Sequence, residues 1–141
     1  MSQTLPSEIY TKPLPPVSQL TKPFWEATKR GELALQHCAG CDQYWFPPST
    51  HCPSCLTRNY TWTPVSGRGK VWSWVVFHQR YFKEFADDLP YNVSFIELDE
   101  GVMMMATVRG VEDGEMRCDL PVSVQFEDAT DEQAIPYFVP A

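Results

Sequence analysis

Short runs of alternating apolar and polar residues fill the chain after residue 64 and predict β-strands. We expect these strands at residues 70–78, 91–98, 102–108, 121–126 and 135–139. Asp99-Glu100-Gly101 separates the second strand from the third, and Gly101 tolerates the positive φ that a tight hairpin turn requires. Strands joined by such short turns pair in antiparallel fashion, so the pattern predicts an antiparallel sheet.

The first of these strands differs from the others because both of its faces are apolar. Strict alternation would put Val71, Ser73, Val75 and Phe77 on one face and Trp72, Trp74, Val76 and His78 on the other. A strand that is apolar on both sides is typical of a sheet that closes on itself. Five short strands of this kind predict an oligonucleotide/oligosaccharide-binding (OB) barrel, which we place at residues 64–141.

Residues 32–63 follow a simple order of short strand and Cys-x-x-Cys turn. Strands are expected at residues 33–37, 43–46 and 59–63. The first turn carries Cys38 and Cys41, and the second carries Cys52 and Cys55. Strands flank each turn and hold it in place, so this segment is expected to form a compact zinc ribbon.

The two turns can aim four thiolates at one point, which is the tetrahedral shell that structural zinc prefers. We therefore expect zinc on the four cysteines, in a closed shell that builds structure and performs no chemistry. A rubredoxin-type iron uses the same ligands and is one alternative. Two disulfides are another, disfavoured because the N-terminus shows no secretory signal. His37 and His51 each precede a cysteine and are weaker candidate ligands.

Residues 1–31 predict a proline-rich arm followed by one short helix. The prolines within residues 1–20 favour an extended arm that either is disordered or lies on a partner. The helix is expected at residues 21–31, because Thr21 can accept a first-turn amide and Gly31 suits the stop. Phe24 and Trp25 make the start of the helix apolar on both sides, so it either caps the core or faces a ligand or partner.

Charge narrows the class of partner. The 141 residues include 11 Lys and Arg against 18 Asp and Glu, so the formal net charge is −7. The basic residues are scattered, and phosphate backbones require a concentrated basic patch, so we expect no nucleic-acid binding. No apolar run approaches the ~18 residues of a membrane-spanning helix. We therefore expect no membrane association, and the lack of a secretory signal predicts a cytoplasmic location, where thiols stay reduced.

The sequence lacks the P-loop, the nucleophile elbow and the dinucleotide fingerprint. His78 is conceivable as a general base, and Cys118 as a nucleophile only if a base lies beside it. A structural explanation is simpler for both. Glu97, Asp99 and Glu100 are best explained as solvated charges of the hairpin. The chain is thus expected to have no catalytic site of its own.

Taken together, these segments resemble a family of zinc-ribbon OB-fold proteins that are associated with acyl-CoA enzymes. The resemblance rests on Phe24-Trp25, the segment Cys38–Cys55 with Phe46-Pro47-Pro48 inside it, Ser66-Gly67-Arg68-Gly69-Lys70-Val71, and residues 90–101. It covers the chain from about residue 18 to the end. The fold it implies is mainly β, with an N-terminal arm and short helix, a rubredoxin-like zinc ribbon and a C-terminal five-stranded OB barrel.

The resemblance also implies the function of a non-catalytic accessory subunit. Family members accompany thiolase-like enzymes, among them sterol-carrier-type thiolase homologues that act as aldolases or acyltransferases, or hot-dog-fold hydratases. They stabilise these enzymes and help to form the acyl-CoA site. For this chain the resemblance implies structural zinc on the four cysteines, contact of Phe24 and Trp25 with acyl-CoA, and a hetero-oligomer with a thiolase-like subunit.

Two other functions remain open at this point. A single-stranded nucleic-acid-binding module is one, because zinc ribbons and OB barrels both occur in such proteins, and it predicts salt-dependent binding. A redox protein with a rubredoxin-type iron is the other, and it predicts a coloured protein.

Overall fold

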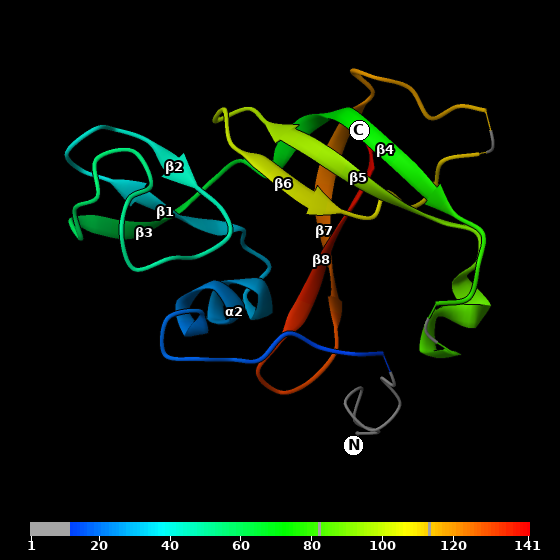
Figure 1. Ribbon diagram of the computed structural model, residues 1–141, viewed down its shortest axis with the longest axis horizontal. Helices are drawn as coiled ribbons and strands as arrows, with labels where there is room; N and C mark the ends of the chain where they lie inside the picture. The colour runs from blue at the N-terminus through cyan, green and yellow to red at the C-terminus, as the bar shows by residue number, and fades with distance from the viewer. Residues whose placement is uncertain (1–11, 82, 113) are drawn as a thin grey trace.

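The computed structural model describes residues 12–81, 83–112 and 114–141, and it confirms a mainly β fold (Figure 1). Helix α2 spans Lys22–Lys29 and precedes a small sheet of β1 (Ala34–Cys38), β2 (Tyr44–Trp45) and β3 (Tyr60–Pro64). A larger sheet contains β4 (Arg68–Phe77), β5 (Tyr91–Leu98), β6 (Met103–Ala106), β7 (Pro121–Asp128) and β8 (Ala134–Pro140). The 3-10 helix η1 (Lys83–Asp88), which was not predicted, connects β4 to β5.

The small sheet is the predicted ribbon. Strand β1 lies between β2 and β3, and both neighbours run antiparallel to it. The predicted strand ends are correct to within one residue. The two Cys-x-x-Cys turns follow β1 and precede β3, so the strands bring both turns to the same end of the ribbon, at the left in Figure 1.

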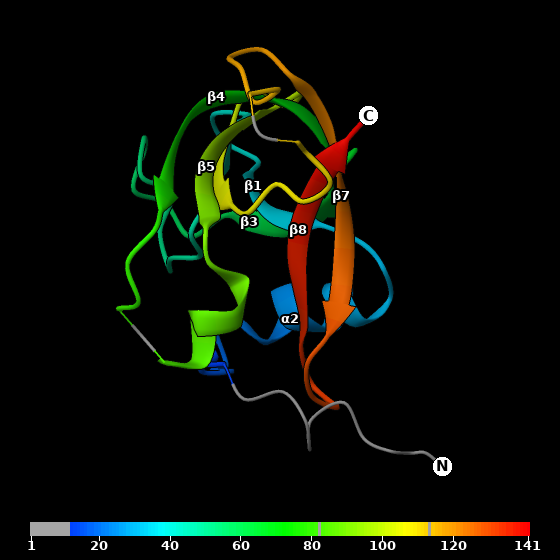
Figure 2. The ribbon, with the colours of Figure 1, turned by 90° about the vertical axis from the view of Figure 1, so that its right-hand side faces the viewer.

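The larger sheet has the strand order β6-β5-β4-β7-β8 and curls into a half-barrel (Figure 2). Its two edges meet just beyond β6, where Val108 forms a parallel bridge with Phe138 of β8. The Phe138 amide donates to the Thr107 carbonyl at 2.9 Å, and the Arg109 amide donates to the Phe138 carbonyl at 2.8 Å. These bonds join the edges of the sheet, and the predicted OB-type architecture is confirmed.

A β-bulge in β4 corrects the predicted faces of that strand. Val71 pairs with Ile96 of β5, but the next partner, Phe95, lies opposite Ser73. Trp72 is therefore an extra residue in the ladder, and the alternation reverses after it. Val71 and Trp74, predicted on opposite faces, both pack into the core, while Trp72 is 58% exposed.

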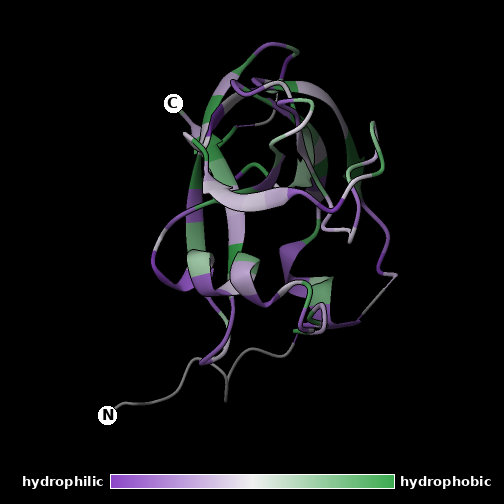
Figure 3. Cartoon of the chain, turned by 90° about the vertical axis from the view of Figure 1, so that its left-hand side faces the viewer, coloured by the Kyte–Doolittle hydropathy of each residue, from purple (hydrophilic) through white to green (hydrophobic). Residues whose placement is uncertain are grey.

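One apolar core runs continuously from the helix and the ribbon into the barrel. Phe24 of α2 and Leu35 of β1 belong to the same buried cluster as Val71, Ile96 and Phe138 of the larger sheet. Hydrophobic stretches lie along the strands that wrap this core (Figure 3). The ribbon is therefore packed against the barrel, and its cysteine turns project from a rigid support.

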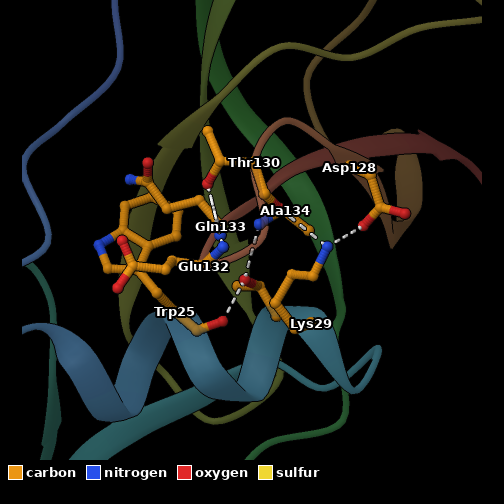
Figure 4. A network of polar contacts seen from close by, with 8 residues as sticks. Trp25, Lys29, Asp128, Thr130, Glu132, Gln133 and Ala134 are labelled. Carbon is orange, nitrogen blue, oxygen red and sulfur yellow. Dashed lines mark hydrogen bonds and ion pairs between the residues drawn. The ribbon is translucent and has the colours of Figure 1, made fainter. Parts of the chain in front are cut away.

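Polar contacts fasten α2 to the hairpin between β7 and β8 (Figure 4). Lys29 Nζ donates to Asp128 Oδ1 at 2.9 Å and to the Thr130 carbonyl at 3.0 Å. The buried Thr28 hydroxyl donates to the Trp25 carbonyl at 2.7 Å and accepts from the Ala134 amide at 3.2 Å. The helix thus caps one end of the core, as one of the two predicted roles requires.

The start and the end of this helix differ in how well they were predicted. Thr21 does not cap the first turn, and its hydroxyl instead accepts the Ser18 amide at 2.9 Å, so that expectation was wrong. Gly31 follows the helix with a φ of +79°, as expected of a stop residue. No helix among the described residues is long and apolar enough to cross a lipid bilayer.

The part of the arm that the structure describes lies on the chain's own barrel. The Pro15 carbonyl accepts the Gln133 side-chain amide at 2.7 Å, Val17 packs against the core, and Lys12 pairs with Asp88 at 2.6 Å. Neither disorder nor a partner is needed to account for residues 12–20. The expectation for residues 1–11 lies outside the described residues.

Candidate metal centre

The two Cys-x-x-Cys turns have the same backbone geometry. The Cys38 carbonyl accepts the Asp42 amide at 2.9 Å, and the Cys52 carbonyl accepts the Leu56 amide at 2.8 Å. Asp42 and Leu56, each directly after the second cysteine of a turn, have left-handed φ values of 59° and 66°. Each turn therefore folds back on its first cysteine and directs both thiols to one side.

The four sulfur atoms form a compact cluster. All four lie within 4.8 Å of one another, and the Sγ atoms are 3.5 Å apart in both the Cys38–Cys55 and the Cys41–Cys52 pairs. A tetrahedral site with Zn–S bonds of about 2.3 Å has S···S edges of about 3.8 Å. A disulfide requires about 2.05 Å, so the disulfide alternative is wrong and all four cysteines are free. The four cysteines are positioned to bind a metal.

Local hydrogen bonds divide the thiols into two kinds. The Cys41 main-chain amide lowers the pKa of Cys38 to about 6, and the Cys55 main-chain amide lowers the pKa of Cys52. A hydrogen bond with the Cys52 side chain raises the pKa of Cys41 to about 12. The lowered pKa values favour the thiolate form of the first cysteine of each turn. The raised pKa of Cys41 favours its thiol form, and binding of a metal cation would displace that proton.

The two ribbon histidines point to other partners and do not join the cluster. His37 Nε2 lies 2.7 Å from Asp42 Oδ1. His51 Nδ1 lies 2.8 Å from the Thr50 hydroxyl, and Arg58 Nε donates to His51 Nε2 at 3.3 Å. In the described part of the chain, the cysteines make up the whole group of ligand atoms that could hold a metal. A shell of four thiolates leaves no open position for a substrate.

Sequence reasoning missed two residues that support this site. Gln36, fully buried on β1, donates to the Ser49 carbonyl at 2.7 Å and accepts the Ser49 amide at 2.9 Å, so it holds the loop between the turns. The Thr57 hydroxyl lies 3.2 Å from Cys55 Sγ. A glutamine directly after the apolar run Leu33-Ala34-Leu35 was the signal for the first, since a buried amide requires partners.

The other candidate residues lie apart from the cysteines. Phe24 and Trp25 are 3% and 6% exposed, with ring centroids 4.9 Å apart in the core, so a contact with acyl-CoA stays a prediction. His78 is exposed just beyond β4. Cys118 is also exposed, and its thiol contacts the Trp72 carbonyl at 3.5 Å. The structure brings together only the four cysteines as a candidate chemical site among the described residues.

Comparison with protein families supports this architecture. Residues 25–61 match the family model of the ChsH2 rubredoxin-like zinc ribbon domain, and residues 62–127 match that of the ChsH2 C-terminal OB-fold domain. The chain belongs to the ChsH2 family. The ribbon and the barrel of this chain thus correspond to the two ChsH2 domains.

Two relatives of this ChsH2-family chain are described as enzyme subunits. It is 29% identical over 130 residues to a probable enoyl-CoA hydratase alpha subunit of Thermomonospora curvata, covering 92% of this chain and 40% of the relative. It is 33% identical over 82 residues to the benzoylsuccinyl-CoA thiolase subunit BbsA of Thauera aromatica, covering 58% and 54%. The chain therefore spans only about half, or less, of these curated relatives.

A solved structure is matched over nearly the whole of its own chain. A chain of the Ltp2-ChsH2(DUF35) aldolase superposes with a TM-score of 0.79 at 28% identity, covering 90% of this chain and 98% of that one. The fold of that solved chain is therefore shared over nine-tenths of this one.

Proposed function

We propose that this chain is a non-catalytic accessory subunit that binds and stabilises a thiolase-like acyl-CoA enzyme and helps to shape its acyl-CoA site. The observation that carries the proposal is the match to 98% of a chain in the Ltp2-ChsH2(DUF35) aldolase. The relation to a subunit of a CoA-ester thiolase points to the same class of partner.

The chemistry of the candidate metal centre supports an accessory role. Four thiolates complete a tetrahedral shell, so a bound metal has no position left to activate water or to polarise a carbonyl. The buried cysteines, Cys38 and Cys52, anchor the metal inside the ribbon. The metal would then hold the two turns together, and catalysis would belong to the partner.

Zinc is the metal that we propose for this site. Tetrahedral sulfur ligands suit zinc or iron, and the ribbon matches a domain described as a zinc ribbon. Metal analysis and an absorption spectrum of the purified chain test this assignment. A colourless protein with one zinc per chain supports it, whereas a coloured ferric-thiolate protein would instead identify a rubredoxin-type redox site.

The proposal includes a direct contact between acyl-CoA and the side chains of Phe24 and Trp25. Both rings lie in the core, where Phe24 packs against Trp25 and Phe46. An acyl chain can reach them only where α2 is displaced from the barrel. This part of the proposal therefore requires a rearrangement of α2 in the assembled enzyme.

Co-expression tests the proposed function. The chain is produced with a thiolase-like subunit of the same organism, and the mixture is analysed by affinity purification, size-exclusion chromatography and thioester turnover. A stable hetero-oligomer, with an enzyme that loses activity or stability when the chain is omitted, supports the proposal. Thioester turnover by the isolated chain would refute the non-catalytic role.

A further inference from the structure

Four large apolar side chains lie together on the outer face of the larger sheet. Phe95 of β5 pairs directly with Met105 of β6, and Val75 of β4 lies one pleat further along the same side. The bulge turns Trp72 outward, where its ring meets that of Phe95 edge to face, with centroids 6.4 Å apart. We call Trp72, Val75, Phe95 and Met105 the outer apolar face.

These side chains are exposed to an unusual degree. Trp72 is 58% exposed, Val75 55%, Phe95 42% and Met105 56%. Large apolar side chains have areas of ~150–250 Å², so the four together present about 400 Å² of apolar surface. Contiguous patches of this size on a soluble domain commonly mark a site of interaction.

Charge is nearly absent from the outer apolar face. At one end of it, Lys70 and Glu97 sit opposite each other in the strand ladder, with Nζ and Oε1 3.8 Å apart. Asp119 Oδ1 also lies 3.8 Å from Lys70 Nζ, so the charges at this end sum to a single negative charge, against a net charge of −7 for the whole chain. Aromatic residues and methionine are enriched in the centres of protein interfaces, and charged residues are depleted there.

The position of the face within the fold also points to binding. Strands β5 and β6 are the second and third strands of the barrel, whose outer surface is where OB folds bind nucleic acids. Nucleic-acid binding needs aromatic side chains together with a basic groove. Here the aromatic side chains are present, but Lys70 is already matched by Glu97, so the chemistry favours a protein partner.

We propose that the outer apolar face is the docking surface for the thiolase-like acyl-CoA enzyme subunit, and that it packs against an uncharged apolar surface of that subunit. This inference rests on the proposed function and adds the location of the interface. A standard interface buries ~800 Å² per partner, so the outer apolar face would supply about half of it as a dry centre. Two copies of this chain, each with a net charge of −7, repel each other, which favours a different protein as the occupant.

The test measures binding of the thiolase-like subunit used in the co-expression experiment, by calorimetric titration at fixed salt. The variants are Trp72→Thr, Phe95→Thr and Met105→Thr, because threonine is polar and suits a strand. The matched control is Val76→Thr, which replaces a β4 side chain that is 44% exposed. Val76 lies two residues after Trp74 and therefore points to the opposite side of the sheet from the outer apolar face. Thermal melts establish that every variant is folded.

We expect at least about 10-fold weaker binding for Phe95→Thr and Trp72→Thr, as for central interface residues, and unchanged binding for Val76→Thr. A photo-crosslinking residue placed at position 105 should couple to the enzyme subunit, and one at position 76 should not. If the wild-type chain binds but the face variants bind equally well, the docking surface is wrong and the proposed function stands. If the wild-type chain does not bind the subunit, both proposals fail.

Two further results would assign the face to another occupant and overturn the inference. A wild-type chain that dimerises by light scattering, with Phe95→Thr monomeric, would assign it to a second copy. Salt-dependent binding of a thymidine oligonucleotide that is lost in Phe95→Thr would assign it to single-stranded nucleic acid.

Discussion

The Thr28 hydroxyl accepts the Ala134 main-chain amide at 3.2 Å and so joins helix α2 to the first residue of β8. The same hydroxyl donates to the Trp25 carbonyl, and the side chain is 1% exposed. A single buried hydroxyl therefore connects the helix near the start of the chain with the last strand of the barrel.

Replacing Thr28 with valine tests this connection. The change keeps the shape of the side chain but leaves the buried Ala134 amide without its acceptor, so we expect a loss of about 1–3 kcal/mol in the free energy of unfolding. Urea denaturation measures the loss, and hydrogen exchange of the Ala134 amide should accelerate. Thr28→Ser is the control, because it retains the hydroxyl and should retain the protection. Equal protection of Ala134 in the valine variant would contradict the assigned bond.

Serine substitutions at two cysteines test the metal centre. Cys55→Ser removes one of the four ligands, so we expect loss of the metal and a lower melting temperature together. Cys118→Ser is the matched control, because Cys118 is also exposed but lies outside the cluster. It should keep the full metal content, as measured by elemental analysis. Full metal content in Cys55→Ser would refute the four-cysteine shell.

The metal centre should also depend on pH. In the folded chain the pKa of Cys38 falls from its ordinary value of 9.0 to about 6, because the Cys41 amide stabilises the thiolate. A lowered pKa contributes stability that is complete above pH 9 and is lost as the pH falls through about 6. In the metal-free chain we therefore expect the free energy of unfolding to decrease as the solution is acidified through this range, and urea denaturation of the chelator-treated chain measures it. A free energy of unfolding that does not change with pH in this range would contradict the assigned thiolate.

Substitution of Phe24 distinguishes its role in the core from a contact with acyl-CoA. The ring is 3% exposed, so Phe24→Ala should destabilise the chain by about 3–5 kcal/mol through the cavity that it leaves. Phe24→Leu fills most of that space and should cost much less. Urea denaturation of both variants, with the KM of the assembled enzyme for its acyl-CoA, separates the roles. A normal free energy of unfolding with a raised KM would place Phe24 in the acyl-CoA site.

The strands and the cysteine cluster could be predicted because their signals are local. The alternation within residues 91–98 predicts β5 with its observed ends, and the Cys-x-x-Cys spacing alone predicts that each turn presents two thiols. A period of two residues and a tight turn depend mainly on neighbours in sequence. The strands and the cysteine turns therefore form in the same way however the distant segments of the chain pack.

The faces and the burial of particular side chains depended on contacts distant in sequence. The pattern of β4 is apolar on both sides, so only pairing with β5 could place the bulge at Trp72 and turn that ring outward. Trp25 was equally ambiguous, because the β7–β8 hairpin that covers α2 lies about 100 residues away along the chain. The sequence by itself determined the strands of the two sheets and the cysteine cluster, whereas the tertiary structure decided which apolar surfaces are buried, because burial depends on which distant segments pack together.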